Sequence, residues 1–381
     1  MRKLAVITTL TLGLAASTFI VACAPRGVEE SGPIRLGYMG PLTGDAASYG
    51  IDTLNAVRMA VEEANATGGV NGRQVELVAE DTRCNGADAA SAAQKLVNVD
   101  KVVAIVGGQC SSETLAAAPI VESAKIVLIS PVSSSPAIAD VGDFVFRVMP
   151  SDAHKAIVTA RYLQRQGYGK IALLSENTDY STGLRDALVA AYGGEKVVFN
   201  ETVDPGTKDF RTLLTRIKDV EFDAFFPNPQ GDAVGAAMVQ QFREAGYDQP
   251  IVSQDVMDSA TLGTIAKDAV EGMRMVNTSN TLGEGGPDSF AARFRAKYGP
   301  AQSSQSFATL AYDAVGLLLG IFAQHGTAGE AVRDALYALP GYTGAAGTIS
   351  FDDKGEVEGI GYALKEFKNG KIVELEPIPI E

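Results

Sequence analysis

The feature that most constrains the fold is a regular alternation between short apolar runs and longer segments with helical spacing. Ile34 to Tyr38 and Val102 to Val106 are continuous apolar runs typical of buried strands, whereas Leu54, Val57 and Val61 recur at the spacing of one helix face. Strands of this kind, separated by amphipathic helices, indicate parallel sheets that helices cover on both faces. The sequence therefore predicts an α/β protein.

A second series of the same kind begins after residue 151, with strands expected at Lys170–Leu174, Ala224–Phe226 and Pro250–Ser253. The final part of the chain changes to alternating strands, with hairpin turns expected at residues 353–355 and 368–370. A chain of 381 residues is long enough to form two cores. The pattern predicts two doubly wound parallel-sheet lobes, with late segments that return to a lobe already begun.

Charge and residue usage exclude several classes of function. The formal net charge of −14 argues against a nucleic-acid binder, because such proteins need a positive surface. Only His154 and His325 are present, so a zinc site built on several histidines is excluded, and we expect no metal and no cofactor. The phosphate-loop, dinucleotide-binding and nucleophile-elbow motifs are absent from the sequence. We expect no catalytic residues.

The N-terminus reads as an export signal. Arg2 and Lys3 precede an apolar run that ends near Val21, although a retained membrane anchor of this length would look similar. The residues Ile20-Val21-Ala22-Cys23 resemble the lipobox of bacterial lipoproteins, in which the cysteine is acylated; an ordinary cleavage site is the alternative. We expect a signal peptide over 1–22, a linker over 23–32, and a protein in the periplasm or on the outer face of the cell membrane. Its only attachment to the membrane would be the lipid at Cys23.

Two further cysteines, Cys84 and Cys110, form an even pair in an exported chain, so a disulfide is expected. Closing this loop of about 26 residues stabilises a protein by about 3 kcal/mol in the chain-entropy model. Two buried thiols are the alternative. Both cysteines follow predicted strands, so the bond would join two loops at the same edge of the sheet.

The residues that follow the predicted strands are the candidates for a binding site, because ligands of such sheets bind beyond the carboxyl ends of the strands. Ser111 and Ser134 stand at expected helix starts, where an anion is attracted, although plain helix capping is the commoner role of such serines. Asp255 ends a strand and suits a cation, with a solvated loop carboxylate as the alternative. Tyr49 and Tyr180 suit the walls of a pocket, although partial core burial is the commoner role of such tyrosines.

Several segments in this order resemble the type I periplasmic-binding fold, and within it the branched-chain amino-acid-binding proteins of ABC importers. The segments are Gly40-Pro41-Leu42-Thr43-Gly44 through Tyr49-Gly50, Cys84 with Cys110-Ser111-Ser112, Ile129 to Pro136, Tyr180, and Gly347 to Asp352 with Lys354-Gly355. The resemblance implies two lobes joined by three crossovers, closing on a ligand between them. We expect an N-terminal lobe over 33–149 plus 278–353 and a C-terminal lobe over 150–277 plus 354–381.

The resemblance also implies roles for single residues. The residues matching Ser111 and Ser134 hold the α-carboxylate of the ligand. The carbonyl matching Val132, the hydroxyl of Ser134 and the acid matching Asp255 take the α-ammonium. Aromatic residues matching Tyr49 and Tyr180 line and close the cleft.

Two departures from the family pattern bear on specificity. Asp255 stands where the best-known members have glutamate, and Asn228-Pro229-Gln230 replaces a loop that carries an aromatic residue in those members. The expected function is capture of a branched-chain or other α-amino acid by a monomeric receptor that delivers it to an ABC permease. The alternatives are a receptor for an amide, a urea or a small aromatic acid, and a sensor that transports nothing. An exported hydrolase using Ser111 or Ser134 would need a histidine that the sequence does not place nearby.

Overall fold

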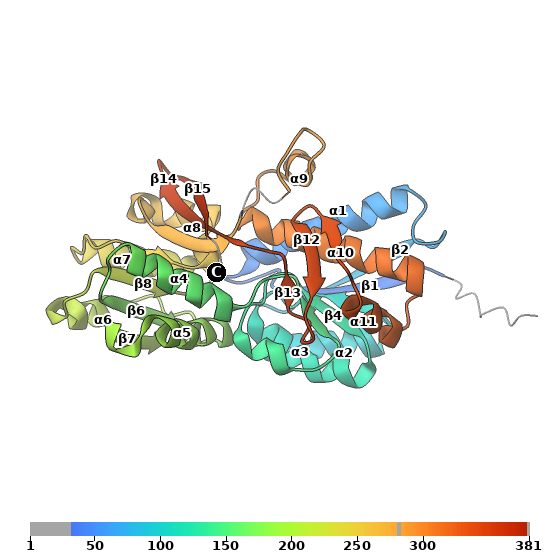
Figure 1. The fold of residues 1–381 in the computed structure, drawn as a ribbon, viewed down its shortest axis with the longest axis horizontal. Helices are drawn as coiled ribbons and strands as arrows, with labels where there is room; N and C mark the ends of the chain where they lie inside the picture. Colours follow the sequence, from blue (N-terminus) through green and yellow to red (C-terminus); the bar gives the residue numbers. More distant parts are fainter. Residues whose placement is uncertain (1–31, 280–282, 379–381) are drawn as a thin grey trace, which may run out of the picture. The chain divides into compact units, whose positions relative to one another are not determined.

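The computed structural model describes residues 32–279 and 283–378 (Figure 1). The predicted signal peptide, Cys23 and almost all of the predicted linker lie outside the described residues.

The first sheet is parallel throughout, with strand order β2-β1-β3-β4-β5. Its strands are β1 (Ile34–Gly40), β2 (Val75–Asp81), β3 (Ala104–Val106), β4 (Val127–Ser130) and β5 (Val145–Arg147). Helices α1 (Ala47–Ala66) and α10 (Gln305–His325) cover one face, and α2 (Gly86–Asn98) and α3 (Ser111–Ala124) cover the other. Successive strand residues serve the two faces in turn: Val106 packs with the α1 side and Ile105 with the α2 side. The predicted doubly wound arrangement is confirmed here.

The second sheet has parallel strands in the order β7-β6-β8, and a bridge between Phe225 and Ile251 continues it to β9 and β10. These strands are β6 (Ile171–Glu176), β7 (Val197–Val203), β8 (Ala224–Asn228), β9 (Val252–Ser253) and β10 (Arg274–Thr278). Helices α4 (Asp152–Arg165) and α5 (Asp179–Tyr192) pack together, as do α7 (Asp232–Glu244) and α8 (Ala260–Ala266), while α6 (Arg211–Arg216) is short. The two sheets with their helices form two lobes.

The chain moves between the lobes more than once. It leaves the first sheet after β5, and returns between β10 and α9 (Phe290–Tyr298), which packs with α1 and α10. Helix α11 (Gly329–Tyr337) and the strands β11 (Tyr342–Gly344), β12 (Gly347–Phe351) and β13 (Val357–Glu358) follow. The strands β14 (Tyr362–Lys368) and β15 (Lys371–Ile378) then join the second sheet in antiparallel pairing. The predicted turn at 368–370 is confirmed: Asn369 and Gly370 both have positive φ, as a type I′ hairpin turn requires.

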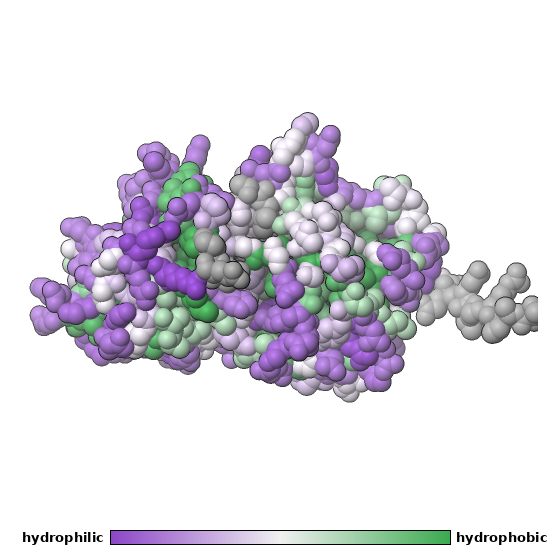
Figure 2. Space-filling model, in the orientation of Figure 1, coloured by the Kyte–Doolittle hydropathy of each residue, from purple (hydrophilic) through white to green (hydrophobic). Residues whose placement is uncertain are grey.

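Among the described residues, α10 has the length and hydropathy of a membrane span, but 78% of its most apolar window is buried in the protein. It packs along α1, as expected for a core helix. The exposed large hydrophobic side chains of the described residues are Val99, Ile157, Ile265 and Leu375. Figure 2 shows a face that is mostly hydrophilic, in keeping with the high content of acidic residues.

Candidate functional site

The loops that follow the strands of both lobes enclose a small cavity of about 220 Å³. It is lined by Tyr49, Gln109, Ser111, Val132 and Ser133 from the first lobe and by Tyr180, Gln230, Asp255 and Val256 from the second. The structure thus brings Tyr49, Ser111, Val132, Tyr180 and Asp255 together, five of the six residues that the sequence singled out for a ligand. The cavity leaves only about 10 Å³ for the centre of a water molecule, so anything larger requires its walls to move.

The first-lobe wall is built around the start of α3. Ser111 is the first residue of this helix, and its Oγ accepts a hydrogen bond from the Ser135 N–H at 3.1 Å, which leaves the hydroxyl proton available for another acceptor. The Glu113 carboxylate accepts bonds from the backbone N–H groups of Gln109 and Cys110 at 2.8 and 3.0 Å. The predicted disulfide between Cys84 and Cys110 is confirmed, and it ties the loop after β2 to this helix start.

Tyr49 is fixed by the first turn of α1. A Cβ at Gly50 would lie 1.7 Å from the Pro41 carbonyl oxygen, so glycine is required for the loop after β1 to pack against this turn. The Tyr49 ring meets Phe307 edge-on, with ring centroids 6.2 Å apart. Its hydroxyl donates to the Gln230 carbonyl at 2.9 Å, which joins the two lobes directly.

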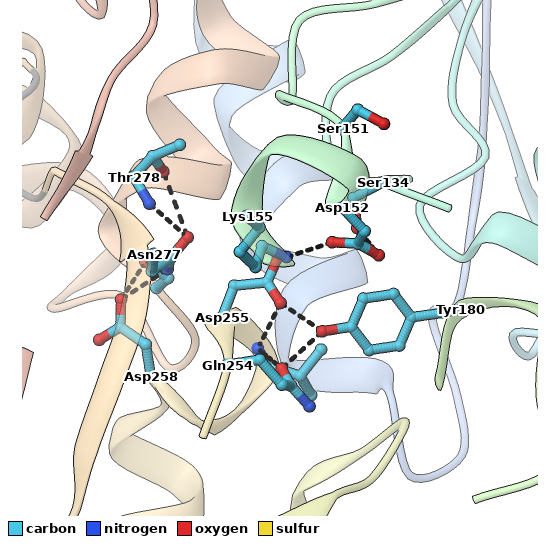
Figure 3. A network of polar contacts seen from close by, with 12 residues as sticks. Ser134, Ser151, Asp152, Lys155, Tyr180, Gln254, Asp255, Asp258, Asn277 and Thr278 are labelled. Atoms are coloured by element: carbon cyan, nitrogen blue, oxygen red, sulfur yellow. Dashed lines mark hydrogen bonds and ion pairs between the residues drawn. The ribbon is translucent and has the colours of Figure 1, made fainter. Parts of the chain in front are cut away.

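The second-lobe wall centres on Asp255, the first residue of the short 3₁₀ helix η4 (Asp255–Met257). Asp255 Oδ1 accepts bonds from the Tyr180 hydroxyl and from the Val256 N–H at 3.1 Å. The Tyr180 hydroxyl also lies 2.5 Å from Gln254 Oε1, so it has one proton for two acceptors. Figure 3 shows these three side chains converging.

A buried lysine that the sequence did not single out lies behind this wall (Figure 3). Lys155 Nζ lies 2.6 Å from Asp152 Oδ1 and 2.8 Å from Asp255 Oδ2, and none of the three side chains is more than 1% exposed. Burial alone would lower the pKa of the Lys155 ammonium, but the carboxylates of Asp152 and Asp255 outweigh it, and the pKa is raised. Burial also raises the pKa of Asp152, with the charge of Asp255 adding to the effect.

Ser134, the sixth predicted residue, does not line the cavity. Its hydroxyl donates to Asp152 Oδ2 at 3.0 Å, and its carbonyl accepts the Asp152 N–H at 2.8 Å. Ser134 therefore holds the start of α4, and its side chain is directed at a carboxylate behind the cavity wall.

The two histidines and the two candidate serines differ in exposure. His154 and His325 are exposed, whereas Ser111 and Ser134 are at most 1% exposed. Among residues 32–279 and 283–378, no group of three or more His, Cys, Asp or Glu side chains is placed to hold a metal ion.

The comparisons with known proteins decide the family. The profile of the family described as periplasmic binding protein matches residues 33–366. A Leu/Ile/Val-binding protein of Rhizobium johnstonii is 30% identical over 379 residues, covering 97% of this chain and 99% of its own length. This chain belongs to the periplasmic binding protein family.

Other relatives of this periplasmic binding protein agree. A leucine-, isoleucine-, valine-, threonine- and alanine-binding protein of Pseudomonas aeruginosa is 30% identical over 88% of this chain and 90% of its own length. A branched-chain amino acid transporter substrate-binding protein of Streptococcus pneumoniae, solved with isoleucine, superposes with a TM-score of 0.82 at 27% identity, covering 90% of this chain and all of the other. The type I periplasmic-binding fold is thereby confirmed, and the family is one of exported solute-binding receptors.

One structural neighbour of this periplasmic binding protein was solved with a ligand that is not an amino acid. A solute-binding protein of an R. palustris ABC transporter, solved with benzoate, has a TM-score of 0.79 over 91% of this chain and 97% of its own. At 19% identity this likeness concerns the fold alone. The fold therefore does not determine the solute.

The periplasmic binding protein also has contacts between its lobes that the sequence did not reveal. Asp45, in the loop before α1, accepts a hydrogen bond from the Ala233 N–H at 2.8 Å, at the start of α7 in the other lobe. Ser48 Oγ donates to Asp232 Oδ2 at 2.6 Å. Burial raises the pKa of Asp232 to about 6. These contacts form only when the lobes are together.

Proposed function

We propose that this protein is an exported receptor that captures an α-amino acid between its lobes and delivers it to an ABC importer. The observation that carries the proposal is the pairing of opposite poles across one small cavity: the start of α3 with Ser111 on one side, and the Asp255 carboxylate on the other. A helix start attracts an anion and a buried carboxylate attracts a cation. An α-amino acid carries both groups on one carbon atom.

In this proposal the α-carboxylate binds the Ser111 hydroxyl and backbone N–H groups at the start of α3. The α-ammonium binds Asp255 and the Val132 carbonyl, and takes the place that the Tyr180 hydroxyl holds beside Asp255. Charge-assisted hydrogen bonds of about 1.5–3 kcal/mol each would give tight head-group capture once the closed lobes exclude water. Ser134 would act through Asp152, to which its hydroxyl is bonded.

The walls beyond the head group are mixed in character. Val132 and Val256 are apolar, whereas Gln109 and Gln230 are polar, and all four line the cavity. We therefore propose an uncharged side chain, aliphatic or polar, as in valine or threonine.

A second candidate is a solute without an ammonium group, such as an amide, a urea or a small aromatic acid. One observation favours it: both oxygens of Asp255 already have partners, in Tyr180, Val256 N–H and Lys155. Under this alternative the ammonium of Lys155 would replace that of the ligand.

The experiment is a thermal-unfolding screen of protein refolded to remove bound solute, with amino acids, amides, ureas and aromatic acids each far above their dissociation constants. The proposal predicts that α-amino acids with uncharged side chains raise the melting temperature by several degrees. A rise with amides, ureas or aromatic acids alone would contradict it.

Asp255→Asn provides the matched variant, because it keeps the size of the side chain and removes the charge. We expect it to weaken the best amino acid of the screen at least tenfold, measured by calorimetric titration. Asp88→Asn, an acid of the α2 surface that pairs with Arg83, should leave the affinity unchanged. Unchanged affinity in Asp255→Asn would refute the role of Asp255.

We propose further that Cys23 carries the lipid anchor and that the mature protein works outside the cytoplasm. Labelled palmitate fed to the cells should then be incorporated into the unmodified protein and not into Cys23→Ser. Uptake of labelled amino acid by cells lacking the receptor would distinguish transport from sensing.

A further inference from the structure

At the cavity wall and behind it, two buried carboxylates share a single buried ammonium group. Asp152 and Asp255 both lie within 3 Å of Lys155 Nζ, and all three side chains are at most 1% exposed. Only Asp255 lines the cavity. Lys155 and Asp152 thus act on a solute through Asp255, as positioning residues.

The surrounding ionisable groups do not change the net charge of Asp152, Lys155 and Asp255. Tyr180 and Tyr362, the ionisable side chains facing the carboxylates from α5 and β14, are buried and held neutral by a strongly raised pKa. Arg147 and Glu356, which also face Tyr362, pair with each other, and so do the buried Asp258 and Lys365. The cluster of Asp152, Lys155 and Asp255 therefore carries one negative charge more than it can compensate internally, and uncompensated buried charge is costly.

We infer that Lys155 and Asp152 set the charge class of the solute: together they leave Asp255 with one unmatched negative charge, so the site takes a head group with a single positive charge. This inference rests on the proposed function, because it names the residues that make an ammonium group necessary. With the solute bound, two carboxylates face two ammonium groups and the closed site is balanced. A hydroxy acid of the same shape would leave the negative charge unmatched.

Replacing Lys155 or Asp152 should change the net charge of the cluster in opposite directions. Lys155→Met leaves two carboxylates close together, so closure on an amino acid requires one of them to bind a proton. Asp152→Asn leaves Asp255 balanced by Lys155, so an added ammonium is in excess and binding favours loss of a proton from Lys155. The double variant Lys155→Met/Asp152→Asn removes one charge of each sign and therefore has the net charge of the unmodified cluster.

The test measures the affinity of these three variants and of the unmodified protein for one amino acid and for its hydroxy-acid analogue, between pH 6 and 8. Each single variant should bind the amino acid at least tenfold more weakly at one end of this range. Relative to the unmodified protein, the affinity of Lys155→Met should fall as the pH rises, and that of Asp152→Asn should rise. Asp152→Asn should also lower the preference for amino acid over hydroxy acid. The double variant should bind the amino acid with an affinity within a few fold of that of the unmodified protein, and with the same pH dependence.

Lys170→Met removes a surface lysine paired with Glu221 and should change nothing. Single variants with the same pH dependence as the unmodified protein, or a double variant as weak as either single one, would overturn the inference, because a merely structural role gives that result. If Lys155→Met does not fold, the opposite trend in Asp152→Asn and the recovery in the double variant still decide it. An unmodified protein that binds no amino acid would instead refute the proposed function.

Discussion

At the scale of single residues, burial decides what a charged side chain does. Glu113 is fully buried beside the disulfide, and its carboxylate accepts bonds from Thr82 and from the N–H groups of Gln109 and Cys110. Burial raises its pKa to about 7, although these hydrogen bonds pull it downward. The folded protein therefore binds this proton more tightly than the unfolded chain does.

The sign of the resulting pH dependence follows from linkage. The contribution of Glu113 to stability is complete below pH 4.5 and is lost as the pH rises through about 7. A shift of this size corresponds to about 3 kcal/mol. Glu113→Gln keeps an acceptor for the two N–H groups and can donate to Thr82, so the variant should gain stability relative to the unmodified protein as the pH rises from 5 to 8. Urea unfolding at several pH values measures the difference, and a constant difference would contradict the prediction.

The residue pattern predicted the site groups that stand at strand ends, because the topology of a parallel sheet brings those ends together. It missed Lys155, since a lysine within a helix usually points to solvent. A signal was present: Lys155, Thr159 and Tyr162 share one face of α4, and that face is buried. Asp152 was missed because an acid in the first turn of a helix needs no further explanation.

At the scale of elements, the alternating pattern predicted the long helices and the central strands of both sheets. It missed β7, an edge strand whose sequence Val197–Val203 mixes apolar and polar residues and whose side chains are only partly buried. It also missed β10, which lies next to the chain's return between the lobes. The contact between Asp45 and α7 joins residues 188 positions apart, and no local pattern contains such information.

The disulfide acts at the element scale, because it joins the loop after β2 to the start of α3. Replacing Cys84 and Cys110 together by serine should lower the free energy of unfolding by about 3 kcal/mol. It should also weaken solute binding, since Ser111 follows Cys110 directly. Denaturant unfolding and titration of the double variant measure the two effects. Full affinity in the variant would show that α3 begins in the same place without the bond.

At the scale of the whole molecule, capture requires that the lobes close, and Asp45 contributes to closure without touching the cavity. Asp45 provides α7 with a side-chain cap that its own N-cap residue, Gly231, does not provide. A cap of this kind contributes about 1 kcal/mol. Asp45→Ala should therefore weaken the affinity by three- to tenfold, because the bond exists only when the lobes are together. Titration calorimetry measures it, and unchanged affinity would show that closure does not depend on this contact.

The central claim is that the closed cavity is built for a head group with one negative and one positive charge. The most direct measurement compares valine with 2-hydroxy-3-methylbutanoate, which differ at the α-substituent alone, by calorimetric titration into refolded protein at pH 7. We predict that the amino acid binds at least tenfold more tightly. Equal affinities, or tighter binding of the hydroxy acid, would contradict the claim and transfer the cationic role to Lys155.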